Sequence, residues 1–280
     1  MRWVVRIVVV WMLGSFGGRA AFAQPAPSGS DPGSSQAAGE PAAASRYPRD
    51  VISRPLTYPA GVAAVGLDLS SATAAFADPA KVRLLAGYGI SDDVEINFGH
   101  YQFPTNDVGK GSLDAGLGWK LVRGAVDGKL EVIARAQTGY DLGASAANPL
   151  LLGAHVQYNV TPSVAIITPG GQLAFGLHGD NRPITFALPV SLGIQVTPVV
   201  YVQADTQLAL IKIANATNAW FGADATPLAV SAYVNVAPPI DVFAGIGADL
   251  TPAAAADGSS RGIGDTAFVI VGGRYYVGAL

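Results

Sequence analysis

Apolar and polar residues alternate with a period of two along most of the chain beyond residue 60. In residues 234–250, V-N-V-A-P-P-I-D-V-F-A-G-I-G-A-D-L, one face is apolar and the other is small or polar. Successive side chains of a β-strand point to opposite faces, so this period predicts strands. A short turn at Pro238-Pro239 joins the two halves, and similar short turns recur near Ser91-Asp92, Thr161-Pro162 and Thr197-Pro198. The pattern therefore predicts antiparallel hairpins.

Twelve alternating segments can be counted, and they predict one closed antiparallel barrel. Short connections alternate with longer ones, an asymmetry typical of outer-membrane barrels, whose short turns face the periplasm. In the segment 163–176 the pattern is interrupted by Thr168-Pro169-Gly170-Gly171, so ten or fourteen strands also fit the sequence. The predicted strands are 61–70, 80–90, 93–102, 112–122, 129–139, 149–160, 163–176, 184–196, 199–213, 225–236, 240–250 and 266–279.

The composition of the two strand faces decides which of them meets lipid. The polar faces are poor in charge and rich in glycine, which is unusual for a surface that meets water. Aromatic residues lie on the apolar face close to the short turns, where a membrane-interface girdle belongs: Tyr88, Trp119, Tyr158 and Tyr275. We therefore expect the apolar face to point outward, although aromatics also favour strands in general. A soluble β-protein would have the opposite arrangement.

The first 60 residues differ from the rest and divide into three segments. Residues 1–23 predict a cleaved signal peptide, with Arg2 and Arg6 before an apolar core and A-F-A at its end. Residues 24–45 are rich in Pro, Ala, Gly and Ser and predict a disordered linker. Residues 46–60 contain three prolines and predict a periplasmic lead-in to a barrel formed by residues 61–280. As an alternative, Arg46, Arg49 and Arg54 point into the lumen.

Composition narrows the classes of protein further. Half of the residues are hydrophobic (50%), yet after residue 23 no run of roughly 18 apolar residues predicts a membrane-spanning helix. The chain has no cysteine, which leaves neither disulfides nor a lipid-modified cysteine. The net charge is −3 and no basic run occurs, which argues against nucleic-acid binding.

Two stretches resemble a known family. The run R-P-L-T-Y-P-A-G at 54–61, followed by G-L-D-L-S at 66–70, resembles the segment before the first strand of exported bacterial outer-membrane β-barrel proteins of the porin-like type. Residues 274–280 are similar to the terminal strand by which such barrels are recognised for assembly, with Leu280 where an aromatic is usual. The resemblance implies the outer membrane of a Gram-negative bacterium, with outer-membrane lipid and the barrel-assembly machinery as partners.

The inward face carries both signs of charge. Such groups must pair or stay hydrated, so they either line a narrow aqueous path or form a ladder of salt bridges that seals it. A mixed set predicts weak ion selectivity, because selective pores need an excess of one sign. The predicted lumen-lining residues are Arg83, Glu95, Asp114, Lys120, Glu131, Arg135, Asp205, Asp249 and Arg274.

No pattern of catalytic residues stands out. The histidines are His100, His155 and His178, and none is paired in sequence with a nucleophile. No metal-ligand cluster and no cofactor motif is evident, so no cofactor is expected. We expect a narrow, weakly selective passive pore for small solutes. The alternative is a plugged structural or surface-interaction barrel; a lipid enzyme and a secreted soluble protein are less favoured. The sequence indicates neither the solute nor the oligomeric state.

Overall fold

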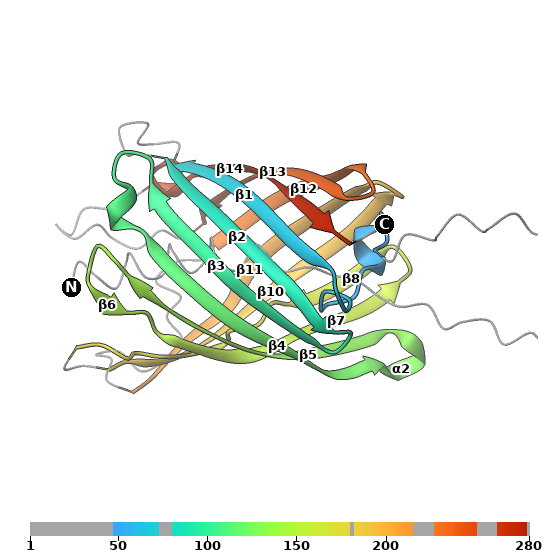
Figure 1. Ribbon diagram of the computed structural model, residues 1–280, viewed down its shortest axis with the longest axis horizontal. Coiled ribbons are helices and arrows are strands. Elements are labelled where there is room, and N and C mark those ends of the chain that lie inside the picture. Colours follow the sequence, from blue (N-terminus) through green and yellow to red (C-terminus); the bar gives the residue numbers. More distant parts are fainter. Residues whose placement is uncertain (1–46, 73–79, 180–181, 215–226, 251–261, 279–280) are drawn as a thin grey trace, which may run out of the picture.

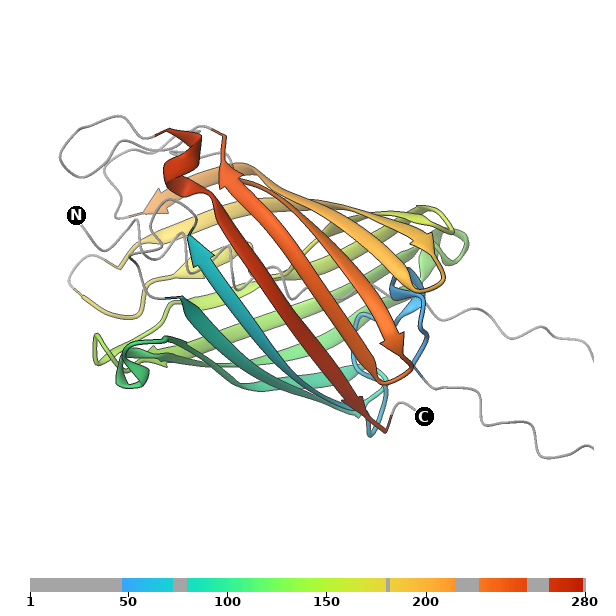
Figure 2. The ribbon, with the colours of Figure 1, turned by 90° about the horizontal axis from the view of Figure 1, so that it is seen from above.

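The computed structural model describes residues 47–72, 80–179, 182–214, 227–250 and 262–278. These residues form a closed antiparallel β-barrel (Figures 1 and 2), which confirms the predicted fold class. The strands are β1 (Ala63–Ala72), β2 (Lys81–Ser91), β3 (Val94–Pro104), β4 (Ser112–Gly124), β5 (Leu130–Asp141), β6 (Ala146–Ala147), β7 (Leu150–Thr161), β8 (Val164–Thr168), β9 (Leu173–Phe175), β10 (Ile184–Thr197), β11 (Val200–Ala214), β12 (Pro227–Ala237), β13 (Ile240–Asp249) and β14 (Phe268–Val277).

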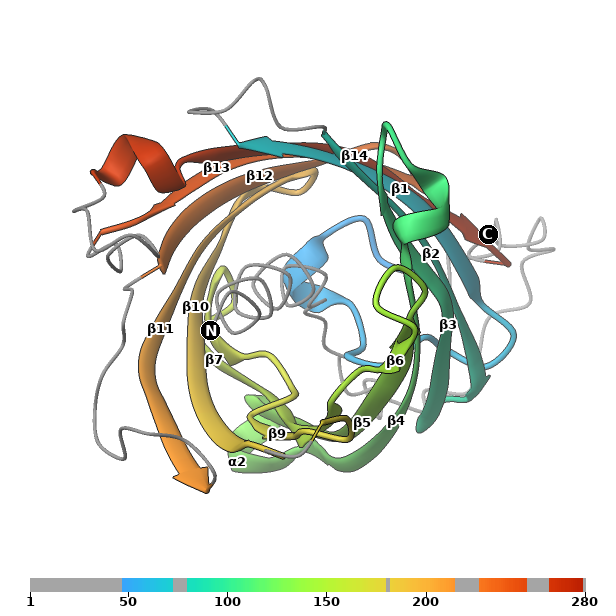
Figure 3. The ribbon, with the colours of Figure 1, turned by 90° about the vertical axis from the view of Figure 1, so that its left-hand side faces the viewer.

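Hydrogen-bonded pairing runs around the whole ring. Strand β1 pairs with β2 on one side and with β14 on the other, and β5 pairs with β7, so the described strands close into a ring. Closure matters because a backbone N–H or C=O in hydrocarbon has no water to bond, and only a closed sheet pairs them all. Figure 3 shows the ring viewed along the barrel.

Twelve strands cross the barrel, because two of the labelled strands are halves of one crossing and a third is a loop extension. Strands β8 and β9 both lie between β7 and β10, while β6 pairs only with the end of β5. The twelve-strand interpretation is therefore confirmed over ten or fourteen.

The break between β8 and β9 falls at the predicted interruption, and the side chain of Gln172 bridges it. Its Oε1 accepts a hydrogen bond from Ala154 N (2.8 Å), and its Nε2 donates to Ala154 O (2.6 Å) and Pro169 O (2.9 Å). Proline has no N–H to give to the ladder, and Gly171 has a φ of 88°. The amide side chain thus replaces backbone bonds that this stretch cannot make.

Exposure alternates along the strands as predicted, with the apolar face outside. On β4, Leu117 and Trp119 are 48% and 58% exposed, whereas the residues that follow each of them, Gly118 and Lys120, are buried. The same alternation on the other strands leaves a band of exposed Leu, Ile and Val around the barrel. This is the reverse of a soluble barrel and suits a lipid-facing wall.

Helical turns are few and short. They are η1 (Val51–Ser53), η2 (Val108–Lys110), α2 (Ala125–Gly128) and η3 (Ile263–Thr266). Among the residues that the structure describes, no helix is long and apolar enough to span a membrane. The short turn between β4 and β5 is α2, in which Asp127 and Gly128 both have positive φ.

The segment before β1 corrects one expectation. Residues 46–60 were predicted to be a lead-in ahead of the barrel, but residues 47–60 fold back into the lumen at the short-turn end (Figure 3, blue). Its prolines exclude regular structure without excluding packing, and the polar inner wall offers hydrogen-bond partners. The alternative expectation, arginines pointing into the lumen, holds for Arg49 and Arg54. Arg46 lies outside the described residues, as do residues 1–23, 24–45 and Leu280, so those assignments stay predictions.

We predict that replacing Gln172 by Ala destabilises the barrel by about 2 kcal/mol, because three hydrogen bonds are lost and buried backbone groups lose their partners. Urea unfolding of protein folded into liposomes measures the change. Gln207→Ala on β11 is the matched control, since the Gln207 side chain makes no hydrogen bond to another described residue. Equal unfolding midpoints for the two variants would show that the bridge is dispensable.

Candidate functional site

The inner wall of the barrel is the candidate site, and its charged side chains form ion pairs between strands. Asp68 on β1 lies opposite Arg83 on β2 and accepts a hydrogen bond from Arg83 Nε (2.7 Å). Arg274 on β14 donates to the same carboxylate from the other side (Nη2–Oδ2, 3.1 Å). All three side chains are buried. Two guanidinium groups thus share one carboxylate.

A second pair of bridges lies on the wall made by β3, β4 and β5. Lys120 Nζ is 2.9 Å from Glu131 Oε1, and Arg135 Nη2 is 2.8 Å from Glu95 Oε1. The Glu95–Arg135 pair spans two strand spacings, because Gly118 on β4 lies between the two residues in register. Sequence analysis nominated all four charged residues, and the structure brings them together as two neutral pairs.

Glycine on the inner face makes these pairs possible. A Cβ on Gly118 would lie 2.8 Å from Glu95 Cγ, one on Gly272 would lie 2.7 Å from Asp68 Oδ1, and one on Gly66 would lie 2.5 Å from Arg274 Cδ. Long charged side chains therefore lie flat across neighbouring glycines. This explains why the polar faces of the strands are rich in glycine.

Asp205 on β11 differs from the paired acids. Its Oδ1 accepts hydrogen bonds from the neutral side chains of Ser191 and Gln203, and its Oδ2 has no hydrogen-bond partner among the described residues. Asp114 on β4 is likewise held by neutral groups, with Asn148 Nδ2 donating at 2.7 Å. Asp249 lies half-buried at the long-loop end of β13. On the wall formed by β10 to β12, the Asp205 carboxyl group thus accepts hydrogen bonds from neutral side chains.

Aromatic rings line the inner wall between the Asp68 cluster and Asp205. The guanidinium of Arg274 lies 4.9 Å from the centre of the Phe243 ring, which stacks on Tyr233 at 5.1 Å. Tyr233 contacts Tyr201 at 5.8 Å, and Tyr201 Oη donates to Gln203. The alternation in residues 234–250 places Phe243 on the small or polar face of its strand, in phase with Asp249, whereas Tyr201 and Tyr233 were not predicted as inward residues.

The residues 47–60, which we call the lumen segment, contact the same wall. Arg54 Nη2 donates to Asp241 Oδ1 at 2.8 Å, and Tyr276 Oη donates to the other oxygen of that carboxylate. Arg49 Nε donates to Asn235 Oδ1 at 2.7 Å. Burial alone would lower the pKa of Arg54, but the hydrogen bond to Asp241 raises that pKa above its ordinary value, so the guanidinium stays charged.

Sequence analysis missed Asp68, Asp241 and Asn235 as wall residues. A signal for Asp68 was present, because it occupies a polar position in the alternating G-L-D-L-S stretch. Asp241 and Asn235 sit beside the short turn at Pro238-Pro239, inside the predicted strands 240–250 and 225–236, but neither was predicted to line the lumen.

The predicted interface aromatics all lie on the outer surface near the short turns. Tyr88, Trp119, Tyr158 and Tyr275 are each exposed, and their register places them within a few residues of the hairpin ends. Their contact with a membrane interface stays a prediction.

His155 is the buried histidine of the wall. It lies opposite Ile133 on β5, is fully enclosed, and neither ring nitrogen has a hydrogen-bond partner among the described residues. His178 is exposed. Within the described ranges no three His, Asp or Glu side chains are grouped as metal ligands would be.

Comparisons with known proteins bear on the fold. No family model matches the sequence, and no curated protein sequence matches it. Among solved structures, the KdgM porin superposes with a TM-score of 0.53 at 8% identity, covering 76% of this chain and 98% of that one. The same porin in complex with disordered oligogalacturonate gives 0.50 at 8% identity over 76% and 98%. The chain has the fold of an outer-membrane β-barrel.

The likeness covers nearly the whole length of the porin and the barrel part of this chain. A third structure, the outer membrane protein Omp33 of Acinetobacter baumannii, matches over 77% of this chain and 97% of that chain, with 10% identity and a TM-score of 0.43. At 8% identity, the match to the KdgM porin shows the barrel fold alone.

We predict that Asp68→Asn destabilises the porin-like barrel by about 3 kcal/mol, because two buried guanidinium groups lose the carboxylate that neutralises them. Urea unfolding in liposomes measures the effect. Asp107→Asn is the control, since the Asp107–Lys110 pair is solvent-exposed and such pairs contribute little. A loss no larger than that of the control would show that the cluster is hydrated and not held by Asp68.

Proposed function

We propose that this protein is an outer-membrane pore through which small solutes diffuse passively, with weak selectivity for charge. The observation that carries the proposal is the inner wall: a closed barrel with a lipid-facing apolar outside and an inside made of glycine, amides and ionised groups. A barrel that served only as a scaffold could fill its interior with apolar side chains. Polar walls are what an aqueous path requires.

Weak selectivity is supported by how the wall charges are paired. Lys120 with Glu131 and Arg135 with Glu95 cancel locally, Arg83 and Arg274 share Asp68, and Asp205 accepts hydrogen bonds from the neutral side chains of Ser191 and Gln203. A strongly selective pore needs an excess of one sign along the path. The described wall residues carry both signs of charge and thus do not form a run of a single sign.

A narrow path is supported by the strand number. Barrels of about eight strands are filled by their own side chains and barrels of about sixteen leave a wide channel. Twelve strands lie between, and the charged side chains lie flat over the glycines of the wall and so occupy little of the interior.

The outer membrane is the location that the fold and the outward apolar band support. Export by residues 1–23, insertion by the barrel-assembly machinery and contact of Tyr88, Trp119, Tyr158 and Tyr275 with the lipid interface complete the proposal. Two of the similar structures are described as a porin, one of them in complex with oligogalacturonate. That ligand is a property of those proteins, and we do not assign it to this chain.

A plugged barrel without transport is the second candidate, and one observation favours it. The lumen segment lies inside the barrel and packs against strands on both sides of the lumen. A surface-interaction role through the longer loops would then replace transport.

Planar-bilayer recording of the folded full-length protein separates the two candidates. The pore predicts discrete conductance steps and a reversal potential close to zero in a salt gradient, because neither ion is strongly preferred. Heat-modifiable gel migration establishes that the added protein is a folded barrel. Folded protein that gives no steps would contradict the pore and favour the plugged barrel.

We predict that Asp205→Ala and Glu131→Ala both change the conductance and shift the reversal potential toward anions. The first removes a carboxylate that accepts hydrogen bonds from neutral side chains, and the second leaves Lys120 uncompensated. Reversal potentials in a salt gradient measure the shift. Asp127→Ala, in the exposed turn α2, controls for removing an acid elsewhere. Reversal potentials equal to that of the control would remove both residues from the conducting path.

A further inference from the structure

The lumen segment (residues 47–60) contacts the inner wall at the short-turn end on several sides. Ile52 N donates to Gln195 Oε1 on β10 at 3.1 Å, and Tyr58 N donates to Glu95 Oε2 on β3 at 3.1 Å. Arg54 reaches Asp241 on β13. These three strands lie far apart around the ring in Figure 3. One short segment therefore crosses the lumen from wall to wall.

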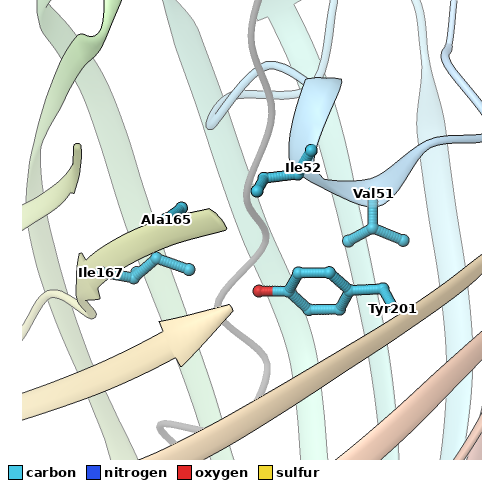
Figure 4. Close-up of a cluster of buried hydrophobic side chains, with 5 residues drawn as sticks. All are labelled: Val51, Ile52, Ala165, Ile167 and Tyr201. Carbon is cyan, nitrogen blue, oxygen red and sulfur yellow. The ribbon is translucent and has the colours of Figure 1, made fainter. Parts of the chain in front are cut away.

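An apolar cluster fastens the middle of the segment. Val51 and Ile52 pack against Ala165 and Ile167 of β8 and against Tyr201 of β11, all of them buried (Figure 4). The inward faces of the neighbouring strands β7 and β10 are polar near this level, as Gln157 on β7 and Gln195 on β10 show. Apolar residues at inward positions of an aqueous wall would face water without the segment, so their presence indicates a built docking site.

Glycines of β2 make room for the end of the segment. A Cβ on Gly87 would lie 2.5 Å from the Tyr58 ring, and one on Gly89 would collide with the backbone oxygens of Tyr58 and Pro59. Thr57 Oγ1 also donates to Asp92 O at the following turn (2.8 Å). The wall is therefore shaped to the segment at the backbone level.

Arg54 is the central anchor. It is 2% exposed, lies over the adjacent rings of Tyr47 and Tyr276 at 4.8 and 5.3 Å from their centres, and bonds Asp241 with two nitrogens. Removing one partner of a buried ion pair leaves an uncompensated charge. Substitution of Arg54 or Asp241 should therefore loosen the segment, whereas the barrel around it is closed by its own backbone bonds.

We propose that the lumen segment is the constriction of this pore, held by Arg54 on Asp241, and that it sets the conductance. This inference rests on the proposed pore function and adds to it the residues that limit passage. The segment is attached to the wall by side chains and not by strand pairing, so its position depends on a few contacts. The charged residues of the inner wall then act on solutes on either side of this narrowest point.

The test is single-channel recording of full-length Arg54→Ala and Asp241→Ala proteins, each shown to be folded by heat-modifiable migration. We expect steps larger by about twofold or more, because interior width governs how much a barrel conducts. The charge-swapped double variant, Arg54→Asp with Asp241→Arg, should return the step toward the natural size. Arg123→Ala is the matched control, since Arg123 pairs with Asp93 on the exposed surface of the same barrel end.

A second readout does not depend on loosening the segment. The chain has no cysteine, so a single Ser53→Cys change can be labelled without ambiguity. A charged thiol reagent added to the bath should reduce the current through this variant and leave a Val126→Cys control, in the exposed turn α2, unaffected. Current reduction restored by a reducing agent would support the constriction.

The outcomes separate the constriction from the pore itself. If Arg54→Ala gives conductance steps of the natural size and the thiol reagent does not reduce the Ser53→Cys current, the constriction is overturned and the pore remains. A silent natural protein with conducting Arg54→Ala channels would support the segment as the closing element and overturn the passive pore. Folded protein that is silent in every variant would overturn both.

Discussion

The hydrogen-bonding demand of the backbone is the constraint from which the rest of the structure follows. In hydrocarbon, each unpaired N–H or C=O costs several kcal/mol, about as much as many side-chain contacts together contribute. The ring of strands meets this demand by pairing β1 with β14 and β5 with β7. Where proline and glycine break the ladder between β8 and β9, the Gln172 side chain supplies the missing bonds.

Because the closed sheet pairs its own backbone groups, its side chains can be apolar on the outside and polar on the inside. The charged side chains inside the barrel must then pair with one another. The protein does this with ion pairs that lie across inward glycines, such as Glu95 and Arg135 over Gly118. Alanine in place of such a glycine would push the two strands' side chains apart. The arrangement of the inner wall thus depends on glycines as much as on charged residues. Gly87 and Gly89 likewise leave space for the lumen segment.

Local periodicity predicts the strands well, because the period of two is present in each of them. The predicted segments 184–196 and 112–122 agree with β10 and β4 to within one or two residues at each end. The outward face and the lumen charges Arg83, Lys120, Glu131 and Arg135 also follow from the alternation, since inward and outward positions are fixed once one residue is placed.

Contacts across the lumen cannot be predicted from local periodicity. Arg54 and Asp241 are 187 residues apart, and no local pattern links them. The three prolines of residues 46–60 correctly exclude a strand, but they carry no information about where an irregular segment packs. Inward aromatics such as Tyr201 and Tyr233 were missed for a related reason. Alternation predicts which face of a strand a residue occupies, but it does not predict which residues pack against it.

The central claim is that apolar side chains face lipid and polar ones face the lumen, and single-cysteine spin labels along β4 test it most directly. Labels at Leu113, Ala115 and Leu117 should be reached by lipid-soluble oxygen, and labels at Ser112, Asp114 and Gly116 by a water-soluble relaxation agent. In liposomes the account predicts accessibility that alternates with a period of two. Labels on the outward positions that respond to the water-soluble agent, or accessibility without alternation, would contradict it.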